Sequence, residues 1–122
     1  MELELKKSDL VQVIFTILTN AKDIFILRDI ESRIINIELS KENDGILLQI
    51  CDSAGGVDKD NIDKIFEPYF TTKHSSQGTG LGLFMVHEIV QNSLKGEISV
   101  YNKIFDSKEE KELSGACFNI RI

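Results

Sequence analysis

A glycine-rich segment has the residue types and spacing needed to bind an anion. Over positions 77–83 the order is Gln77, Gly78, Thr79, Gly80, Leu81, Gly82 and Leu83. Glycine lacks a Cβ and tolerates positive φ, so successive backbone N–H groups can point into one concavity that suits phosphate. A helical run follows at once, and its first N–H groups would add to that attraction. These residues alone leave an ordinary glycine-rich turn open as the alternative.

The segment before these glycines, residues 66–77, lacks periodicity and contains the only proline, Pro68. Its length and composition predict a mobile loop of the kind that carries function. Lys73 in this loop could supply a point charge for phosphate, and we expect His74 beside it to approach phosphate or solvent. His74 and His87 are isolated from other metal-binding side chains, so they predict no zinc site.

Asp52 stands at the end of a run with period two. Residues 33–39 and 45–52 both alternate, and Asn43, Asp44 and Gly45 between them predict a hairpin turn. Asp52 continues the apolar face of the second run, so its carboxylate enters the interior if that face is the core side. Such a carboxylate needs hydrogen-bond donors, and the glycines at 55 and 56 leave room for a flat ligand. The alternative is an aspartate that caps its own turn.

A helix is expected over residues 10–28, after an N-cap signal at Ser8 and Asp9. Its apolar stripe is expected at positions 11, 14, 15, 18, 21 and 25. Thr16, Asn20 and Asp23 share a different face and could hold a ligand, although a solvated helix face explains them equally well. Further along we expect a short helix or turn at 58–65, a helix at 80–93, and strands at 97–101 and 116–122, with a charged hairpin loop between these strands.

The 122 residues predict one domain, spanning 1–122, that reads as an excised piece of a longer protein. The net charge of −6 gives no support to nucleic-acid binding. No run approaches the ~20 apolar residues that cross a bilayer, and no signal-like start is present. Cys51 and Cys117 lie in apolar strand-like runs, so we expect buried thiols in a reducing compartment, with a disulfide as the less favoured alternative.

Four segments in order resemble the ATP-binding catalytic domain of bacterial sensor histidine kinases, a superfamily shared with DNA gyrase, a heat-shock chaperone and MutL. Residues 12–23 resemble the family's N box, 52–57 its first glycine box, 65–73 its F box and 78–83 its second glycine box. The resemblance covers residues 10–122. The short loop between Lys73 and Gly78 resembles the lids of the nitrogen-regulation type of sensor kinase.

The resemblance implies a role for each matching residue. Asn20 would coordinate Mg²⁺ on the ATP phosphates, with Asp23 in a water-mediated contact, and Asp52 would accept a hydrogen bond from the adenine amino group. Lys73 would contact the terminal phosphate, so Asn20 and Lys73 are the expected catalytic residues. The remaining expected nucleotide contacts are Gly56, Phe70, Thr72, Gly78, Thr79, Gly80, Leu81 and Gly82.

The chain departs from the family at two positions. Thr16 replaces an asparagine or acid, which argues against a built-in ATPase, since ATP-hydrolysing relatives carry a glutamate there. Cys117 stands where a threonine near the adenine is common, which puts one polar contact in doubt. His87 precedes an acid, as the phosphorylated histidine of sensor kinases does, but it flanks an apolar helix stripe and is expected to be structural.

The resulting prediction is a two-layer α/β sandwich of the Bergerat type, with a mixed, mostly antiparallel sheet and about three helices on one face. The expected function is to bind Mg²⁺ and ATP and to donate the γ-phosphate to a histidine on a separate dimerisation domain, and through it to a response regulator. The domain is expected to be monomeric and cytoplasmic, without direct membrane contact. Two alternatives remain: a nucleotide-binding regulatory module without kinase activity, and an anti-sigma-factor-type serine kinase.

Overall fold

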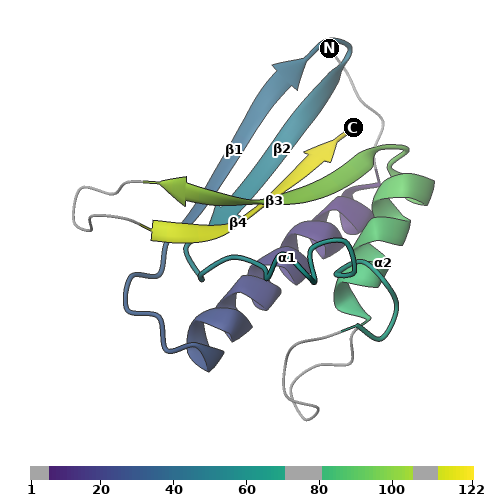
Figure 1. Ribbon diagram of the computed structural model, residues 1–122. Helices are drawn as coiled ribbons and strands as arrows, with labels where there is room; N and C mark the ends of the chain where they lie inside the picture. Colours follow the sequence, from purple (N-terminus) through teal and green to yellow (C-terminus); the bar gives the residue numbers. More distant parts are fainter. Residues whose placement is uncertain (1–5, 71–80, 106–112) are drawn as a thin grey trace.

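The computed structural model of the chain describes residues 6–70, 81–105 and 113–122. The elements follow in the order α1 (Lys7–Leu27), β1 (Ile35–Glu42), β2 (Gly45–Asp52), α2 (Gly82–Glu88), the π-helical turn η1 (Ile89–Ser93), β3 (Glu97–Phe105) and β4 (Leu113–Arg121). Figure 1 shows two layers, with the strands in one sheet and α1 and α2 together on one side of it. The α/β sandwich is therefore confirmed. The described helices are α1 and α2 with its continuation η1, rather than about three.

The sheet has the strand order β1-β2-β4-β3, and every pairing between the described strands is antiparallel rather than mixed. The predicted hairpin is confirmed: β1 pairs with β2 from Ile35↔Asp52 to Glu42↔Gly45. Asn43 enters the connecting turn with φ of 52°, a conformation that asparagine tolerates better than most residues. β4 lies between β2 and β3, so the last strand of the chain joins the two hairpins.

The face of α1 that enters the core differs from the expected one. Val13, Ile17, Ala21 and Phe25 are buried, whereas Phe15 is 67% exposed. The predicted burial of positions 21 and 25 is thus confirmed, and the predicted burial of positions 11 and 15 is wrong. The reason is that residues 10–18 are apolar at seven of nine positions, so several stripes fit the helical period and packing chooses among them. The helix also begins at Lys7, without a side-chain cap from Ser8 or Asp9.

By length and composition α1 could also cross a membrane. In the fold it is instead the central helix of the core, where its buried face packs against Leu48 and Ile50 of β2 and Phe118 and Ile120 of β4. The core of a globular protein satisfies the same compositional test, so α1 gives little support to a membrane span.

The predicted helix at 80–93 is confirmed with a change of pitch. α2 ends at Glu88 and continues as η1, where Leu94 N donates to Ile89 O at 3.0 Å. Val86 and Val90, one helical turn apart, are buried on its core side. In the segment 58–65, expected as a short helix or turn, residues 59–65 form a series of turns.

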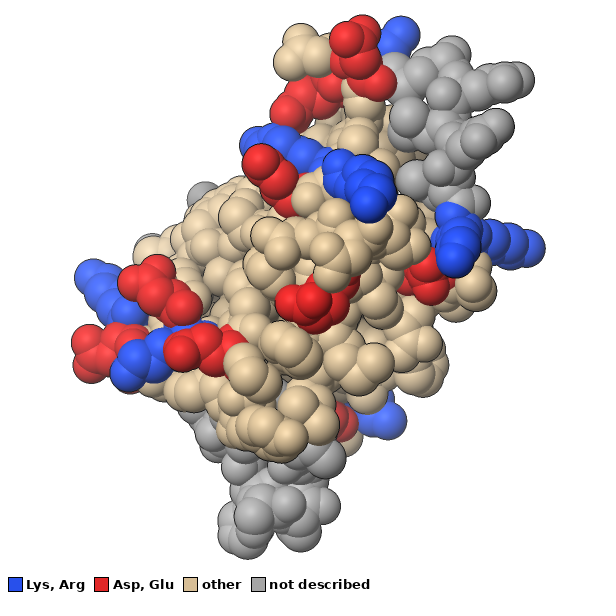
Figure 2. All heavy atoms as spheres, turned by 90° about the vertical axis from the view of Figure 1, so that its right-hand side faces the viewer, with Lys and Arg blue, Asp and Glu red and all other residues tan. Residues whose placement is uncertain are grey.

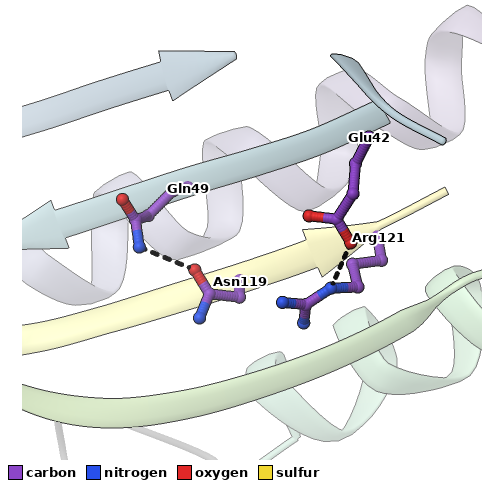
Figure 3. Close-up of polar contacts among 4 residues, drawn as sticks. All are labelled: Glu42, Gln49, Asn119 and Arg121. Carbon is purple, nitrogen blue, oxygen red and sulfur yellow. Dashed lines mark hydrogen bonds and ion pairs between the residues drawn. The ribbon is translucent and has the colours of Figure 1, made fainter. Parts of the chain in front are cut away.

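The face of the sheet opposite the helices is mostly polar. Gln49 Nε2 donates to Asn119 Oδ1 at 2.9 Å, and Arg121 pairs with Glu42 at 2.9 Å across the intervening strand (Figure 3). Figure 2, which views the molecule from the side of α2, shows Lys and Arg interspersed with Asp and Glu rather than gathered in one patch.

Cys51 and Cys117 form a disulfide on this outer side of the sheet, which contradicts the expectation of free thiols. Their burial is confirmed, with exposures of 3% and 0%. The two residues are direct partners in the register of β2 and β4, and their Cα atoms are 4.0 Å apart. The sequence places each cysteine in a strand but carries no information on this pairing, because the strands lie 66 positions apart.

Candidate functional site

Asp52 is a buried carboxylate at the inner end of β2, only 7% exposed. Its side chain lies on the same face as Leu48 and Ile50, as the alternation predicted. Ala54 N donates to Oδ1 at 3.0 Å and Ala116 N donates to the same oxygen at 3.3 Å. Within the described part of the chain, no donor reaches Oδ2. Asp52 therefore caps its own turn, which is the alternative that the sequence left open.

Burial raises the pKa of Asp52 above its ordinary value of 3.8, because desolvation disfavours the carboxylate. The two backbone hydrogen bonds oppose that rise in pKa, and the positive charge of Arg28 opposes it further. A carboxylate whose ionised form is costly gains more than an exposed one from a donor on a bound ligand.

Close packing at Gly115 brings β4 to this carboxylate. A Cβ at Gly115 would lie 1.4 Å from the Asp52 carbonyl oxygen, so only glycine fits there. This approach allows the next residue, Ala116, to donate its N–H to Asp52. Ala116 belongs to the core cluster with Phe118 and Ile120, whereas Cys117 points to the other face. On β4 the residue beside the Asp52 carboxylate is therefore Ala116, and the Cys117 side chain points away from it.

The loop that follows Asp52 runs through Gly55 and Gly56, which both have positive φ, 102° and 81°. Arg28, at the end of α1, and Asn102, in β3, hydrogen-bond to this loop. Neither residue was predicted from the sequence. The signal for Asn102 was present, since it continues the face of Ile98 and Val100 just as Asp52 continues that of Leu48 and Ile50.

Asn20 lies on α1, half-buried, one position before the buried Ala21. Ala21 packs in a cluster with Phe25 and Ala54, and Ala54 is the residue whose N–H holds Asp52. The turn after β2 therefore contacts α1 one residue away from Asn20. Asp23, also half-buried, lies about one helical turn further along α1.

The start of α2 lies against the same region of α1. A Cβ built at Gly82 would be 3.4 Å from the Thr16 methyl group, and Thr16 precedes Asn20 by one helical turn. At the other end of this antiparallel pair, Ser93 donates a hydrogen bond to Asp9. Leu81 immediately precedes α2, and its carbonyl accepts a hydrogen bond from Met85 N. The beginning of α2 and the polar face of α1 are thus neighbours.

Residues 66–70 pack against the core beside α2, through the side chains of Phe66 and Phe70. The Phe66 ring lies 5.5 Å from that of His87 and 6.3 Å from that of Phe118. His87 is half-buried in this cluster, in agreement with its expected structural role. Phe70 is also half-buried against the core. Five predicted site residues lie outside the described residues: Thr72, Lys73, Gly78, Thr79 and Gly80.

The arrangement brings a buried carboxylate, a glycine loop and a helix-borne amide to one end of the layer between sheet and helices. A comparison with protein families matches residues 6–122 to the histidine kinase-, DNA gyrase B- and HSP90-like ATPases. The chain belongs to this family. Its likeness within the family is to the ATP-binding catalytic domain of sensor histidine kinases.

The relatives are consistent with this assignment. The chain is 36% identical to the two-component sensor PprA of Pseudomonas aeruginosa over 97 residues, which are 77% of its length. It is 45% identical to the sensor histidine kinase ZraS of Escherichia coli over 58 residues, which are 48% of its length. It spans only 10% and 12% of these two proteins. Among solved structures, the catalytic domain of the histidine kinase ThkA matches with a TM-score of 0.71 and 25% identity, over 98% of this chain and 69% of that one.

Proposed function

We propose that this histidine-kinase-type domain binds Mg²⁺ and ATP and donates the γ-phosphate to a histidine on a separate dimerisation domain of its parent sensor kinase. The observation that supports the proposal most strongly is the state of Asp52. Both backbone donors reach Oδ1, and the other oxygen of this buried carboxylate is left for a donor outside the described chain. Among the described residues no buried side-chain oxygen lacks a partner, so Oδ2 is open to a donor from outside.

The adenine amino group is a suitable partner for Oδ2. Adenine carries an N–H donor at the ring position where guanine carries an oxygen acceptor. Guanine would place two acceptors face to face in a buried site, which costs on the order of 3 kcal/mol. Gly56 in the adjoining loop is the proposed neighbour of the flat base, and Asp52 would supply the choice between bases.

The other end of the nucleotide would lie between α1 and the start of α2. Asn20 offers a neutral carbonyl oxygen, a hard ligand that suits Mg²⁺, and Mg²⁺ commonly takes one or two protein ligands with phosphate and water. Among the described residues no three acidic, histidine or cysteine side chains converge, so the phosphates themselves would supply much of the coordination. The bound Mg²⁺ would neutralise phosphate charge.

The remaining contacts fall to the predicted residues around the two glycine-rich segments. Asp23 would act on the metal through water, and Lys73 would contact the terminal phosphate. Phe70, Thr72, Gly78, Thr79, Gly80, Leu81 and Gly82 would enclose the phosphate chain. The acceptor imidazole is itself the nucleophile, so the domain would act by positioning and by charge neutralisation.

The acceptor histidine must come from a partner. The half-buried His87 packs against the ring of Phe66, which makes it unsuitable as an exposed acceptor. The proposed partner is the dimerisation and phosphoacceptor domain, and through it a response regulator. The sensor kinases that this chain resembles are many times longer than the part it matches, which leaves room for such a domain. We propose a cytoplasmic, monomeric domain, without direct membrane contact.

Phosphotransfer between separate domains tests the proposal. The domain is mixed with the dimerisation domain of its parent, labelled ATP and Mg²⁺, and the acid stability of the label is measured. Acid-labile phosphohistidine is expected, and it should disappear in Asn20→Ala. Asn92→Ala is the matched control, because Asn92 is an exposed helical asparagine in η1 whose side chain donates to Glu88 on α2. Undiminished transfer in Asn20→Ala would refute the metal role, and acid-stable phosphoserine would favour the serine-kinase alternative.

A further inference from the structure

The loop after Asp52, residues 54–57, is held in place by two side chains from distant elements. Arg28, the residue that ends α1, donates from Nη1 to the carbonyl oxygen of Ala54 at 2.7 Å and to that of Gly56 at 2.9 Å. One guanidinium nitrogen therefore bridges two carbonyl groups of the loop. This fixes the chain on both sides of Gly55.

Asn102 holds the same loop from the side of the sheet. Its Nδ2 donates to the Val57 carbonyl oxygen at 2.6 Å, and its Oδ1 accepts from Val57 N at 2.7 Å. Both polar atoms of the amide are thus bonded to one residue, 45 positions earlier in the chain. The amide replaces the partner that a neighbouring strand would otherwise provide.

Each of the two side chains lies directly against one of the two glycines. A Cβ at Gly55 would lie 2.8 Å from Arg28 Nη1, and a Cβ at Gly56 would lie 2.8 Å from Asn102 Oδ1. Both distances are too short for a real carbon atom. The two glycines are therefore needed for the approach of these two side chains, in addition to any room they leave for a ligand.

Backbone hydrogen bonds hold part of this loop, since Ser53 N donates to Ile34 O and Gly55 N donates to Ser114 O, both at 3.0 Å. The bonds from Arg28 and Asn102 restrain further groups, namely the carbonyls of Ala54 and Gly56 and both backbone groups of Val57. The loop also supplies Ala54 N to the Asp52 carboxylate. A loop without such restraints would lose conformational entropy when a ligand ordered it, and this loss would weaken binding. Two side chains that hold the loop beforehand remove that cost.

We propose that Arg28 and Asn102 are positioning residues, which hold residues 54–57 in the binding conformation before the nucleotide arrives. This inference rests on the proposed function, since it names residues that prepare the base subsite of the same nucleotide site. Neither residue touches the reacting phosphate. Their loss should therefore weaken the binding of ATP without altering the rate of phosphotransfer at saturation.

Asn102→Ala is the main test, with Asn119→Ala as the matched control. Asn119 lies in the neighbouring strand β4, and its side chain bonds to Gln49 on the outer face of the sheet, away from the loop. We expect Asn102→Ala to raise the Kd for ATP and the KM about tenfold and to leave kcat unchanged. Asn119→Ala should leave the Kd and KM as they are.

A second readout follows the loop itself. The amide proton of Val57 should exchange faster with solvent in ligand-free Asn102→Ala than in the wild type, and bound ATP should restore its protection. Asn102→Asp should also weaken binding, because a carboxylate keeps the acceptor for Val57 N but places an oxygen, in place of the NH₂ donor, opposite Val57 O. If Asn102→Ala does not fold, Arg28→Lys serves in its place, since a lysine cannot reproduce the geometry of the guanidinium.

The outcomes separate the inference from the function on which it rests. A wild-type domain that does not bind ATP refutes the proposed function. A wild type that binds, together with an Asn102→Ala variant of unchanged Kd, KM and Val57 exchange, overturns the positioning role alone. Equal losses in Asn102→Ala and Asn119→Ala would also overturn it, because they would show general destabilisation of the sheet.

Discussion

Replacement of Asp52 by asparagine tests the base-binding role with unusual sharpness, because the backbone determines how the new amide lies. Ala54 N and Ala116 N both donate to Oδ1, at 3.0 and 3.3 Å. Only an oxygen can accept these bonds, so the asparagine carbonyl takes the place of Oδ1 and the NH₂ group takes that of Oδ2. Asp52→Asn thereby converts the acceptor that faces the ligand into a donor.

An adenine amino group would then face a second donor. The loss of a charge-assisted hydrogen bond, with a buried donor left unpaired, costs about 3 kcal/mol, or about a hundredfold in Kd. Guanine presents an acceptor at the same ring position, so the binding of GTP should not weaken. The preference for ATP over GTP should fall by about a hundredfold or more in Asp52→Asn.

Although Asp52→Asn should lower the affinity for ATP, it should raise the free energy of unfolding of the ligand-free domain. Folding raises the pKa of Asp52 above 3.8 through burial, so the folded state holds this proton to a higher pH than the unfolded state does. The contribution of Asp52 to the free energy of unfolding is therefore greatest below pH 3.8 and is lost as the pH rises through the raised pKa of the folded state. Asparagine carries no charge and has no such loss. The free energy of unfolding of the ligand-free variant should therefore increase relative to that of the wild type as the pH rises from acidic to neutral.

Calorimetric titration with ATP and GTP measures the first effect, and urea unfolding at several pH values measures the second. Asp58→Asn is the matched control, because Asp58 Oδ1 also accepts a backbone N–H from two residues ahead, Asp60 N at 2.9 Å, but is exposed. It should leave nucleotide preference unchanged. Full ATP affinity in a folded Asp52→Asn variant, with no shift in the ATP-to-GTP ratio, would refute the assignment of Asp52 to the base.

Two further substitutions or treatments test the structure around this carboxylate. Gly115→Ala would place a Cβ 1.4 Å from the Asp52 carbonyl oxygen. We therefore expect it to lower the free energy of unfolding by about 3 kcal/mol or more. Gly82→Ala is the control, because the nearest atom to its Cβ is 3.4 Å away, and it should have a far smaller effect in the same unfolding experiment. The disulfide joins residues 66 positions apart, so its reduction should lower the free energy of unfolding by about 4 kcal/mol in the chain-entropy treatment. A variant with both cysteines replaced by alanine should show no change in stability on addition of reductant. If the wild type and this variant responded equally to reductant, the cross-link would be contradicted.

Much of the fold follows from patterns that are local in the sequence. Alternation with period two is a property of any single strand, so it placed Leu48, Ile50 and Asp52 on one face before their partners were known. The hairpin between β1 and β2 followed for the same reason, since its turn residues and both strands are adjacent. The order of the glycine-rich segments along the chain likewise indicated the family, which the comparison confirmed.

Other features depend on which distant residues meet, and no local pattern carries that information. The register of β2 against β4 decides that Cys51 pairs with Cys117 and that Ala116, rather than Cys117, reaches Asp52. Packing against the sheet chose among several apolar stripes of α1.

The sequence by itself determined the type of most elements and, in the strands, the face on which each side chain stands, because side chains alternate every two residues along a strand. Only the tertiary structure decided the contacts made by Arg28 and Asn102, which lie 26 and 45 positions from the residues that they hold. Such contacts form because the sheet and α1 bury their apolar faces against each other, and this burial brings together polar side chains that no spacing along the chain relates.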